Sequence, residues 1–175
     1  MSIRPKFYIS IGIMACLSSF EAMVIFDVES SEKFGAIREL IGKASKSQNL
    51  GDLKGLEKIV IKREKLASTA CGHSVAFTHG KTDQVDDIII ILGVSRSGIS
   101  FDSPDGKPVN FLFLIISPPR KQLEYLMVLS SLARIFHNDV CKEDIVSELS
   151  VPVVRRKMKR FLKQKRFNFL RRASC

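Results

Sequence analysis

Four segments of the chain carry apolar residues at the spacing of an amphipathic helix. The first helix is expected to start within Ser30–Lys33, with a serine N-cap and a carboxylate in its first turn. A second is expected over 53–66 and a third, the most strongly amphipathic, over 121–136. One further helix is expected over 139–149.

Short apolar runs lie between these segments. Residues 23–26 and 75–77 are expected to form short strands, whereas 88–92 and 111–116 are continuous apolar runs, typical of strands buried on both faces. Alternating helices and buried strands predict an α/β protein. We expect a three-layer α/β/α sandwich with a central mixed β-sheet.

Charge divides the chain into unequal parts. The formal net charge is +10, yet residues 151–175 hold ten lysines and arginines and no acidic residue, which leaves 18 basic against 18 acidic residues in 1–150. We therefore expect a leader or disordered N-terminus over 1–16, a neutral domain over 17–150 and a basic amphipathic tail over 151–175. The tail suits contact with anionic lipid or nucleic acid; the alternative is a solvated terminal helix.

The N-terminus and the cysteines bear on the compartment. Residues 7–20 are uncharged and follow Arg4 and Lys6, which resembles a signal peptide or, around Cys16, a lipoprotein site. The run is too short for a membrane span, so a start at Met14 or a disordered leader is the alternative. None of the four cysteines forms a C-x-x-C pair, so we expect free thiols in a reducing, cytoplasmic environment.

Chemistry-bearing side chains concentrate in residues 68–81. This connection holds two imidazoles, His73 and His79, and two hydroxyls, Ser68 and Thr69. An imidazole with such neighbours suits a general base, a metal ligand or a phosphoryl acceptor. A metal site is disfavoured because no third ligand follows at a suitable spacing, and a serine hydrolase because no G-x-S-x-G motif is present. No cofactor is expected.

Two ordered motifs resemble one known family. Residues 63–81 read REKLASTACGHSVAFTHGK, and residues 98–109 read GISFDSPDGKPV. They are similar to the R-E-x-L-x-S-T-x-x-G-x-x-I-A-x-P-H and G-I-x-F-D-x-x-D-G-x-P-V segments of enzyme IIA domains of the fructose/mannitol class, from the bacterial phosphoenolpyruvate-dependent phosphotransferase system. Residues 17–40 also resemble that family's first strand and helix, so the resemblance covers about 17–149.

The resemblance implies that His79 carries the phosphoryl group. A neutral imidazole is a competent nucleophile near pH 7. Arg63, Ser68, Thr69 and backbone N–H groups near the glycines are then expected to stabilise the transferred charge. The alternative for Arg63 is a solvated charge at a helix end.

Several residues depart from the family's pattern or have a smaller expected role. Thr78 replaces the usual proline, and Tyr125 stands where many members have a second histidine. A phenol donates a hydrogen bond but does not accept a proton as imidazole does, which bears on onward transfer. His73 is expected to hydrogen-bond within its loop, and Cys71 to be a buried or half-buried thiol.

Two functions follow from the resemblance. The first is a phosphocarrier that accepts phosphoryl from HPr or a similar phosphocarrier protein. Because no permease domain is fused, the nitrogen-regulatory type is favoured over a sugar importer, with a regulated target protein such as a kinase or transporter. The second is a transfer-deficient binding module, for which Tyr125 and Thr78 are the signs.

Overall fold

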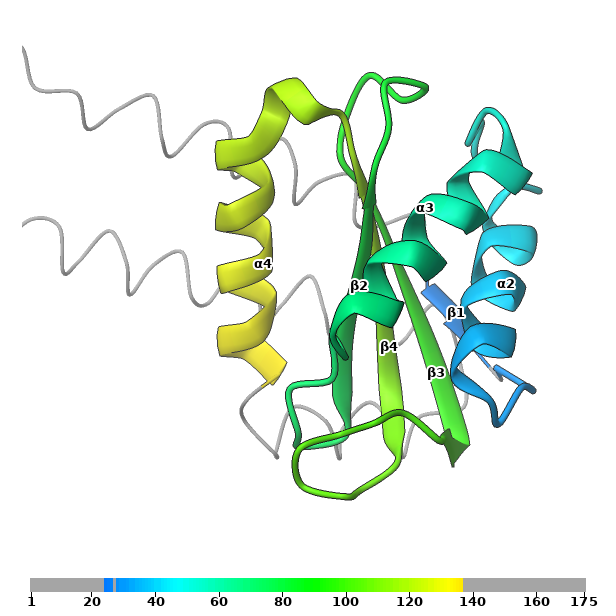
Figure 1. The fold of residues 1–175 in the computed structure, drawn as a ribbon, viewed down its shortest axis with the longest axis vertical. Coiled ribbons are helices and arrows are strands. Elements are labelled where there is room, and N and C mark those ends of the chain that lie inside the picture. Colours follow the sequence, from blue (N-terminus) through cyan, green and yellow to red (C-terminus); the bar gives the residue numbers. More distant parts are fainter. Residues whose placement is uncertain (1–23, 27, 137–175) are drawn as a thin grey trace, which may run out of the picture.

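The computed structural model describes residues 24–26 and 28–136, which form a sheet with helices beside it (Figure 1). In chain order the elements are β1 (Val24–Phe26), α2 (Lys33–Ala44), α3 (Leu53–Leu66), β2 (Val75–Lys81), β3 (Ile89–Ile99), β4 (Val109–Ser117), the short 3-10 helix η2 (Pro119–Lys121) and α4 (Gln122–Phe136).

The described strands form one mixed sheet in the order β1-β3-β4-β2. β3 and β4 are antiparallel neighbours, whereas β1 runs parallel to β3 and β2 runs parallel to β4. The register places His79 of β2 beside Ile115 of β4. β2 is therefore an edge strand of the described sheet, and His79 lies on that edge strand.

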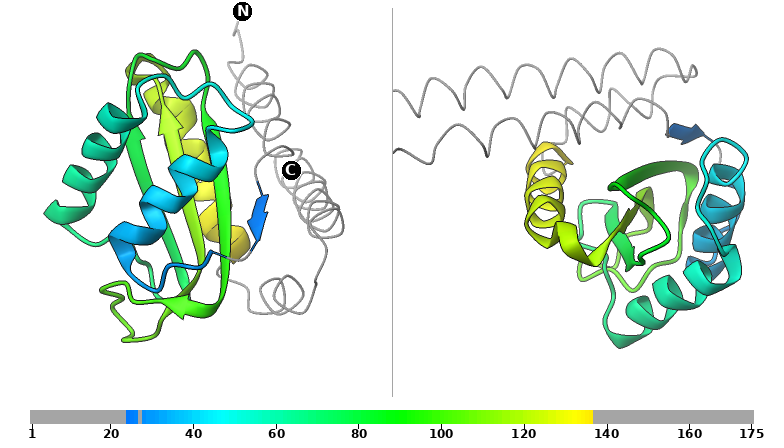
Figure 2. Two further views of the ribbon diagram at one scale, coloured as in Figure 1. Left: turned by 90° about the vertical axis from the view of Figure 1, so that its right-hand side faces the viewer. Right: turned by 90° about the horizontal axis from the view of Figure 1, so that it is seen from above.

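Helices cover both faces of the sheet (Figures 1 and 2): α2 and α3 lie on one face and α4 on the other. Each face has its own apolar core. Toward α4 the core includes Ile90, Phe113 and Leu132, and toward α2 and α3 it includes Leu40 and Ile91. The prediction of a three-layer α/β/α sandwich with a central mixed sheet is confirmed.

The strands are longer than the apolar runs that predict them. β2 continues four residues past the expected end at Phe77, so His79 lies on a strand and the prediction that it lies in a loop is wrong. The cause is tertiary, because Thr78 to Lys81 pair in parallel with residues 114–117 of β4. Residues 78–81 are mostly polar and would be expected in a turn from their local sequence, but this pairing keeps them in the strand.

The start of α2 also differs from the expectation. The helix begins at Lys33 with Glu32 at the N-cap, whose side chain makes no capping bond, and the first turn holds no acidic residue. The Ser30 hydroxyl instead bonds locally, accepting from the Glu32 N–H at 3.3 Å and donating to the Glu32 carbonyl at 3.2 Å. The predicted serine N-cap is wrong because that hydroxyl closes a turn before the helix.

Some predictions fall outside the described residues: the helix over 139–149, the leader over 1–16 and the basic tail over 151–175. Within the described part of the chain, every helix is too short or too polar to span a bilayer.

Two glycines permit close approach between a helix and the sheet. A Cβ on Gly93 of β3 would lie 2.6 Å from Leu40 Cδ2 and 2.8 Å from Val28 Cγ2. A Cβ on Gly80 of β2 would lie 2.8 Å from Val60 Cγ2 of α3. The second contact sets α3 directly against β2, beside His79.

The Gly93 contact predicts the sign of an alanine substitution. Gly93→Ala should lower the free energy of unfolding by about 1–3 kcal/mol, the usual cost of overpacking a filled core. Gly42→Ala, in α2, is the matched control: nothing lies within 4 Å of its added Cβ, so better helix propensity should raise stability by about 0.5–1 kcal/mol. Urea unfolding of both variants checks the pair, and equal effects would contradict the packing described here.

Candidate functional site

His79 lies on β2 with two hydrogen-bond partners of opposite chemistry. Its Nδ1 lies 3.1 Å from the Phe77 carbonyl oxygen, and its Nε2 lies 3.1 Å from Nε of Arg63. A carbonyl only accepts and a guanidinium only donates, so both contacts specify one tautomer. Nδ1 carries the proton, and the Nε2 lone pair faces Arg63.

The environment keeps this imidazole neutral. Burial is the largest influence and lowers the pKa of His79 from its usual value of 6.5, because the charged form is desolvated. The Phe77 carbonyl and Glu64 act to raise that pKa, whereas Arg63 and Lys81 act to lower it, and the net shift is downward. At pH 7 His79 therefore presents a lone pair at Nε2.

Arg63 is directed toward His79 by the end of α3. It lies in the last turn of that helix, and its Nη1 donates to the Ala67 carbonyl at 3.1 Å just beyond it. The side chain is half-buried and its Nε reaches His79. This geometry differs from that of a solvated helix-end charge, and it leaves a cation next to Nε2 of His79.

Ser68 and Thr69 have different surroundings. The Ser68 hydroxyl accepts from the Ala70 N–H at 3.3 Å, which leaves its own proton available to a ligand. The Thr69 hydroxyl donates to Glu64 Oε2 at 2.5 Å, and the Thr69 N–H donates to Glu64 Oε1 at 3.0 Å. Thr69 is thus directed to a buried carboxylate rather than to the imidazole.

Glu64 is a residue of the site that the sequence analysis missed. It is 1% exposed, and Lys33 Nζ lies 3.9 Å from its Oε1. One sequence signal could have indicated its burial. Glu64 follows Leu56 and Val60 at intervals of four residues, so this charged residue falls on the buried face of an amphipathic helix.

Tyr125 contacts the imidazole from the opposite helix layer. It is buried on α4, and its ring centroid lies 5.4 Å from that of His79. Burial raises the pKa of Tyr125 above its usual 10, with Arg63 acting in the opposite direction. The phenol therefore keeps its proton at pH 7 and can act as a donor only at its O–H.

Asp105 joins the second motif to the turn before β2. Gly72, His73 and Ser74 all have positive φ, and the His73 N–H donates to Asp105 Oδ2 at 2.8 Å. The Ser103 hydroxyl and that N–H lower the pKa of Asp105 to about 2. The ionised carboxylate of Asp105 thus anchors the middle residue of a turn in which three successive residues have positive φ, and it links the two motifs in space.

Neither Thr78 nor Cys71 faces the His79 imidazole. Thr78 is fully buried, and among the described residues its Oγ1 has no hydrogen-bond partner. Adjacent strand residues point to opposite faces, so Thr78 and His79 point away from each other.

Cys71 is exposed, so the prediction of a buried or half-buried thiol is wrong. The residue lies in the hairpin that covers the outer edge of β2, and its side chain meets solvent there.

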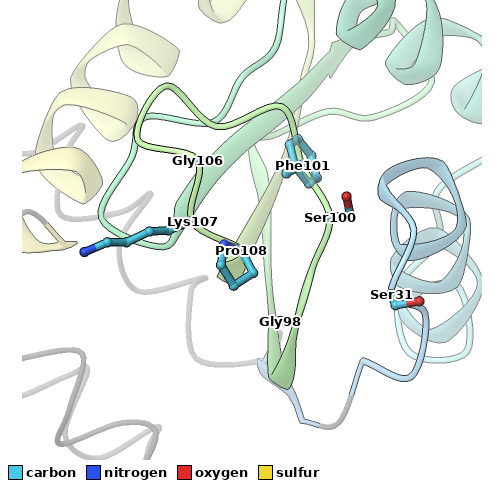
Figure 3. Close-up of a pocket in the computed structure, with 7 residues that line it drawn as sticks. All are labelled: Ser31, Gly98, Ser100, Phe101, Gly106, Lys107 and Pro108. Atoms are coloured by element: carbon cyan, nitrogen blue, oxygen red, sulfur yellow. The ribbon is translucent and has the colours of Figure 1, made fainter.

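A separate hollow of about 380 Å³ lies between the segment before α2 and the loop after β3 (Figure 3). Ser31 comes from the first, and Ser100, Phe101 and Lys107 come from the second. The lining residues do not include His79, Arg63 or Tyr125. The candidate site is thus a half-buried imidazole at a sheet edge rather than a residue within this hollow.

Comparison with known proteins finds relatives over most of the chain. Residues 20–150 match the family described as phosphoenolpyruvate-dependent sugar phosphotransferase system, EIIA 2. A nitrogen regulatory protein of Bradyrhizobium diazoefficiens is 31% identical over 114 residues, which are 65% of this chain and 74% of that protein. The fructose-specific EIIABC component of Bacillus subtilis is 28% identical over 120 residues, 69% of this chain, but the chain spans only 19% of that protein.

A solved structure extends the likeness to three dimensions. The nitrogen regulatory protein IIA-Ntr of Neisseria meningitidis superposes with a TM-score of 0.72 at 28% identity, over 81% of this chain and 99% of that one. With a family match over most of its length, this chain belongs to the EIIA type 2 family of the phosphoenolpyruvate-dependent sugar phosphotransferase system.

Proposed function

We propose that this protein is a regulatory phosphocarrier that accepts a phosphoryl group on His79 Nε2 from a phosphohistidine of an HPr-like protein. The observation that carries the proposal is the pair of contacts at 3.1 Å, which leaves a neutral ring with its lone pair at Nε2 beside a guanidinium. Members of the family act as phosphocarriers, and nitrogen regulatory proteins are among the relatives.

The transfer needs no general base. The Nε2 lone pair forms the new N–P bond, while the N–P bond of the donor breaks and its electron pair returns to the donor's imidazole. The proton on Nδ1 stays in place, and the Phe77 carbonyl stabilises the positive charge that the ring gains. Arg63 moves off the ring plane as phosphorus approaches, and its guanidinium then binds the phosphoryl oxygens.

The other donors have matching roles in this proposal. Ser68 and Tyr125 supply hydroxyl protons to the phosphoryl oxygens, because neither proton is used by a bond within the described site. Thr69 does not contact the phosphoryl group in this proposal; its N–H and hydroxyl bind Glu64 instead. The downstream partner is a regulated protein such as a kinase or transporter, and we place the reaction in the cytoplasm.

Phosphorylation on His79 is tested by incubating the full chain with labelled phosphoenolpyruvate, Enzyme I and HPr. The wild type should gain one acid-labile phosphate per chain. His79→Asn should gain none, whereas the matched control His73→Asn should be labelled like the wild type, since His73 is exposed and its left-handed backbone suits asparagine. An unlabelled wild type would instead support the transfer-deficient binding module.

Arg63 is tested by the rate of phosphorylation. Arg63→Met should lower the initial rate by about 10²–10³-fold, as expected on loss of one preorganised donor to a transferred group. Lys62→Met removes an exposed cation from the preceding position of α3 and should change the rate less than threefold at 0.15 M salt. If both variants lost the same rate, Arg63 would act only by attracting the donor protein through its charge, which would contradict a role at the phosphoryl group.

The pKa of His79 gives a test without any partner protein. An NMR titration of its ring should show a midpoint below 6.5, because desolvation and the nearby cations disfavour the charged ring. Arg63→Met should move the midpoint upward, since Arg63 lowers this pKa. The rate of phosphorylation should accordingly fall only as the pH drops through this lowered midpoint, where the ring gains its second proton. A wild-type midpoint above 6.5 would contradict the described environment.

A further inference from the structure

A short segment before β2 pairs with the outer edge of that strand. Ala70 and Ala76 form an antiparallel bridge, flanked by a bond from the Cys71 N–H to the Val75 carbonyl at 2.9 Å. On the other side, the Phe77 N–H donates to the Thr69 carbonyl at 3.1 Å. This hairpin covers the edge of β2 up to Phe77, immediately before His79.

The pairing of Thr69 with Phe77 is incomplete. Residues opposite each other at a hydrogen-bonded position of an antiparallel ladder exchange two N–H···O bonds. Thr69 and Phe77 make one of them, whereas the Thr69 N–H donates to Glu64 Oε1 at 3.0 Å. The Phe77 carbonyl, which that N–H would otherwise reach, receives His79 Nδ1 at 3.1 Å.

We propose that Glu64 is a positioning residue: it takes the Thr69 N–H away from the Phe77 carbonyl and thereby supports, together with Arg63, the Nδ1–H tautomer of His79. The inference rests on the proposed function, since it concerns which nitrogen of that imidazole attacks phosphorus. With the Phe77 carbonyl free to accept, Nδ1 holds the proton and Nε2 keeps its lone pair.

Glu64 is suited to this role by its own fixed geometry. Its side chain is fully buried, and its second oxygen accepts the Thr69 hydroxyl at 2.5 Å. Lys33 Nζ lies 3.9 Å from Oε1 and 2.5 Å from Asp102 Oδ2 in the second motif. A buried carboxylate with two donors and a nearby cation has one stable orientation, so the diverted N–H has a constant partner.

Removal of the carboxylate should restore the ordinary ladder. In Glu64→Met, an apolar residue of similar length, the Thr69 N–H has no acceptor there and turns to the Phe77 carbonyl. It then competes with His79 Nδ1 for that oxygen. Glu64→Gln keeps one acceptor oxygen for the Thr69 N–H, and the Thr69 hydroxyl can rotate to accept from the amide NH₂. The glutamine variant should therefore behave like the wild type.

The test is the ring ¹⁵N spectrum of His79 in the full chain at pH 7.5, assigned with His79→Asn. Wild type and Glu64→Gln should show the Nδ1–H tautomer. In Glu64→Met the ratio of Nδ1–H to Nε2–H should fall about five- to tenfold, the factor that corresponds to loss of one hydrogen bond. A loss of stability alone would leave this ratio unchanged, so an unaltered ratio in folded Glu64→Met overturns the proposal.

A second measurement keeps the proposal testable if Glu64→Met does not fold. In the wild type, a scalar coupling across the hydrogen bond should join the Thr69 amide nitrogen to the Glu64 carboxylate carbon. Coupling to the Phe77 carbonyl carbon instead overturns the proposal. Neither measurement involves phosphorylation, so failure here is distinct from failure of the proposed phosphocarrier function, which the labelling of His79 reports.

Discussion

The site depends on one imidazole held between a group that only accepts hydrogen bonds and a group that only donates them. The Phe77 carbonyl fixes the proton on Nδ1, and the Arg63 guanidinium meets the lone pair on Nε2. Burial lowers the pKa of His79, so the ring is neutral near pH 7. In the proposed transfer, these three residues supply the nucleophile, its orientation and a cation for the transferred group.

The positions of these three residues depend on the elements around them: the edge strand β2, the packing of α3 and the turn before β2. The edge position of β2 leaves His79 half-buried, accessible to another protein rather than enclosed in the hollow beside α2. Gly80 allows α3 to pack against that strand, which brings Arg63 within reach. Asp105 fixes the turn that precedes β2. An accessible nucleophile on a rigid edge suits a group that passes between proteins.

The departures from the family pattern are not equivalent. Thr78 has a buried hydroxyl without a partner among the described residues, on the face of β2 opposite His79, so its effect falls on packing and stability. Tyr125 contacts the imidazole itself, with ring centroids 5.4 Å apart. Tyr125 offers a hydrogen-bond donor where a second imidazole would offer a base. In the proposed function, Tyr125 rather than Thr78 therefore bears on what happens to the phosphoryl group.

The sequence by itself determined the fold class, the helices α3 and α4 and the motif around His79, because apolar periodicity and ordered motifs are local properties of the chain. It did not show that β2 continues through His79, since that depends on pairing with β4, or that Glu64 is buried beneath the site. Only the tertiary structure decided the tautomer of His79 and the direction of Thr69. Those follow from hydrogen bonds between α3, the hairpin and β2, whose geometry exists only after these segments pack together.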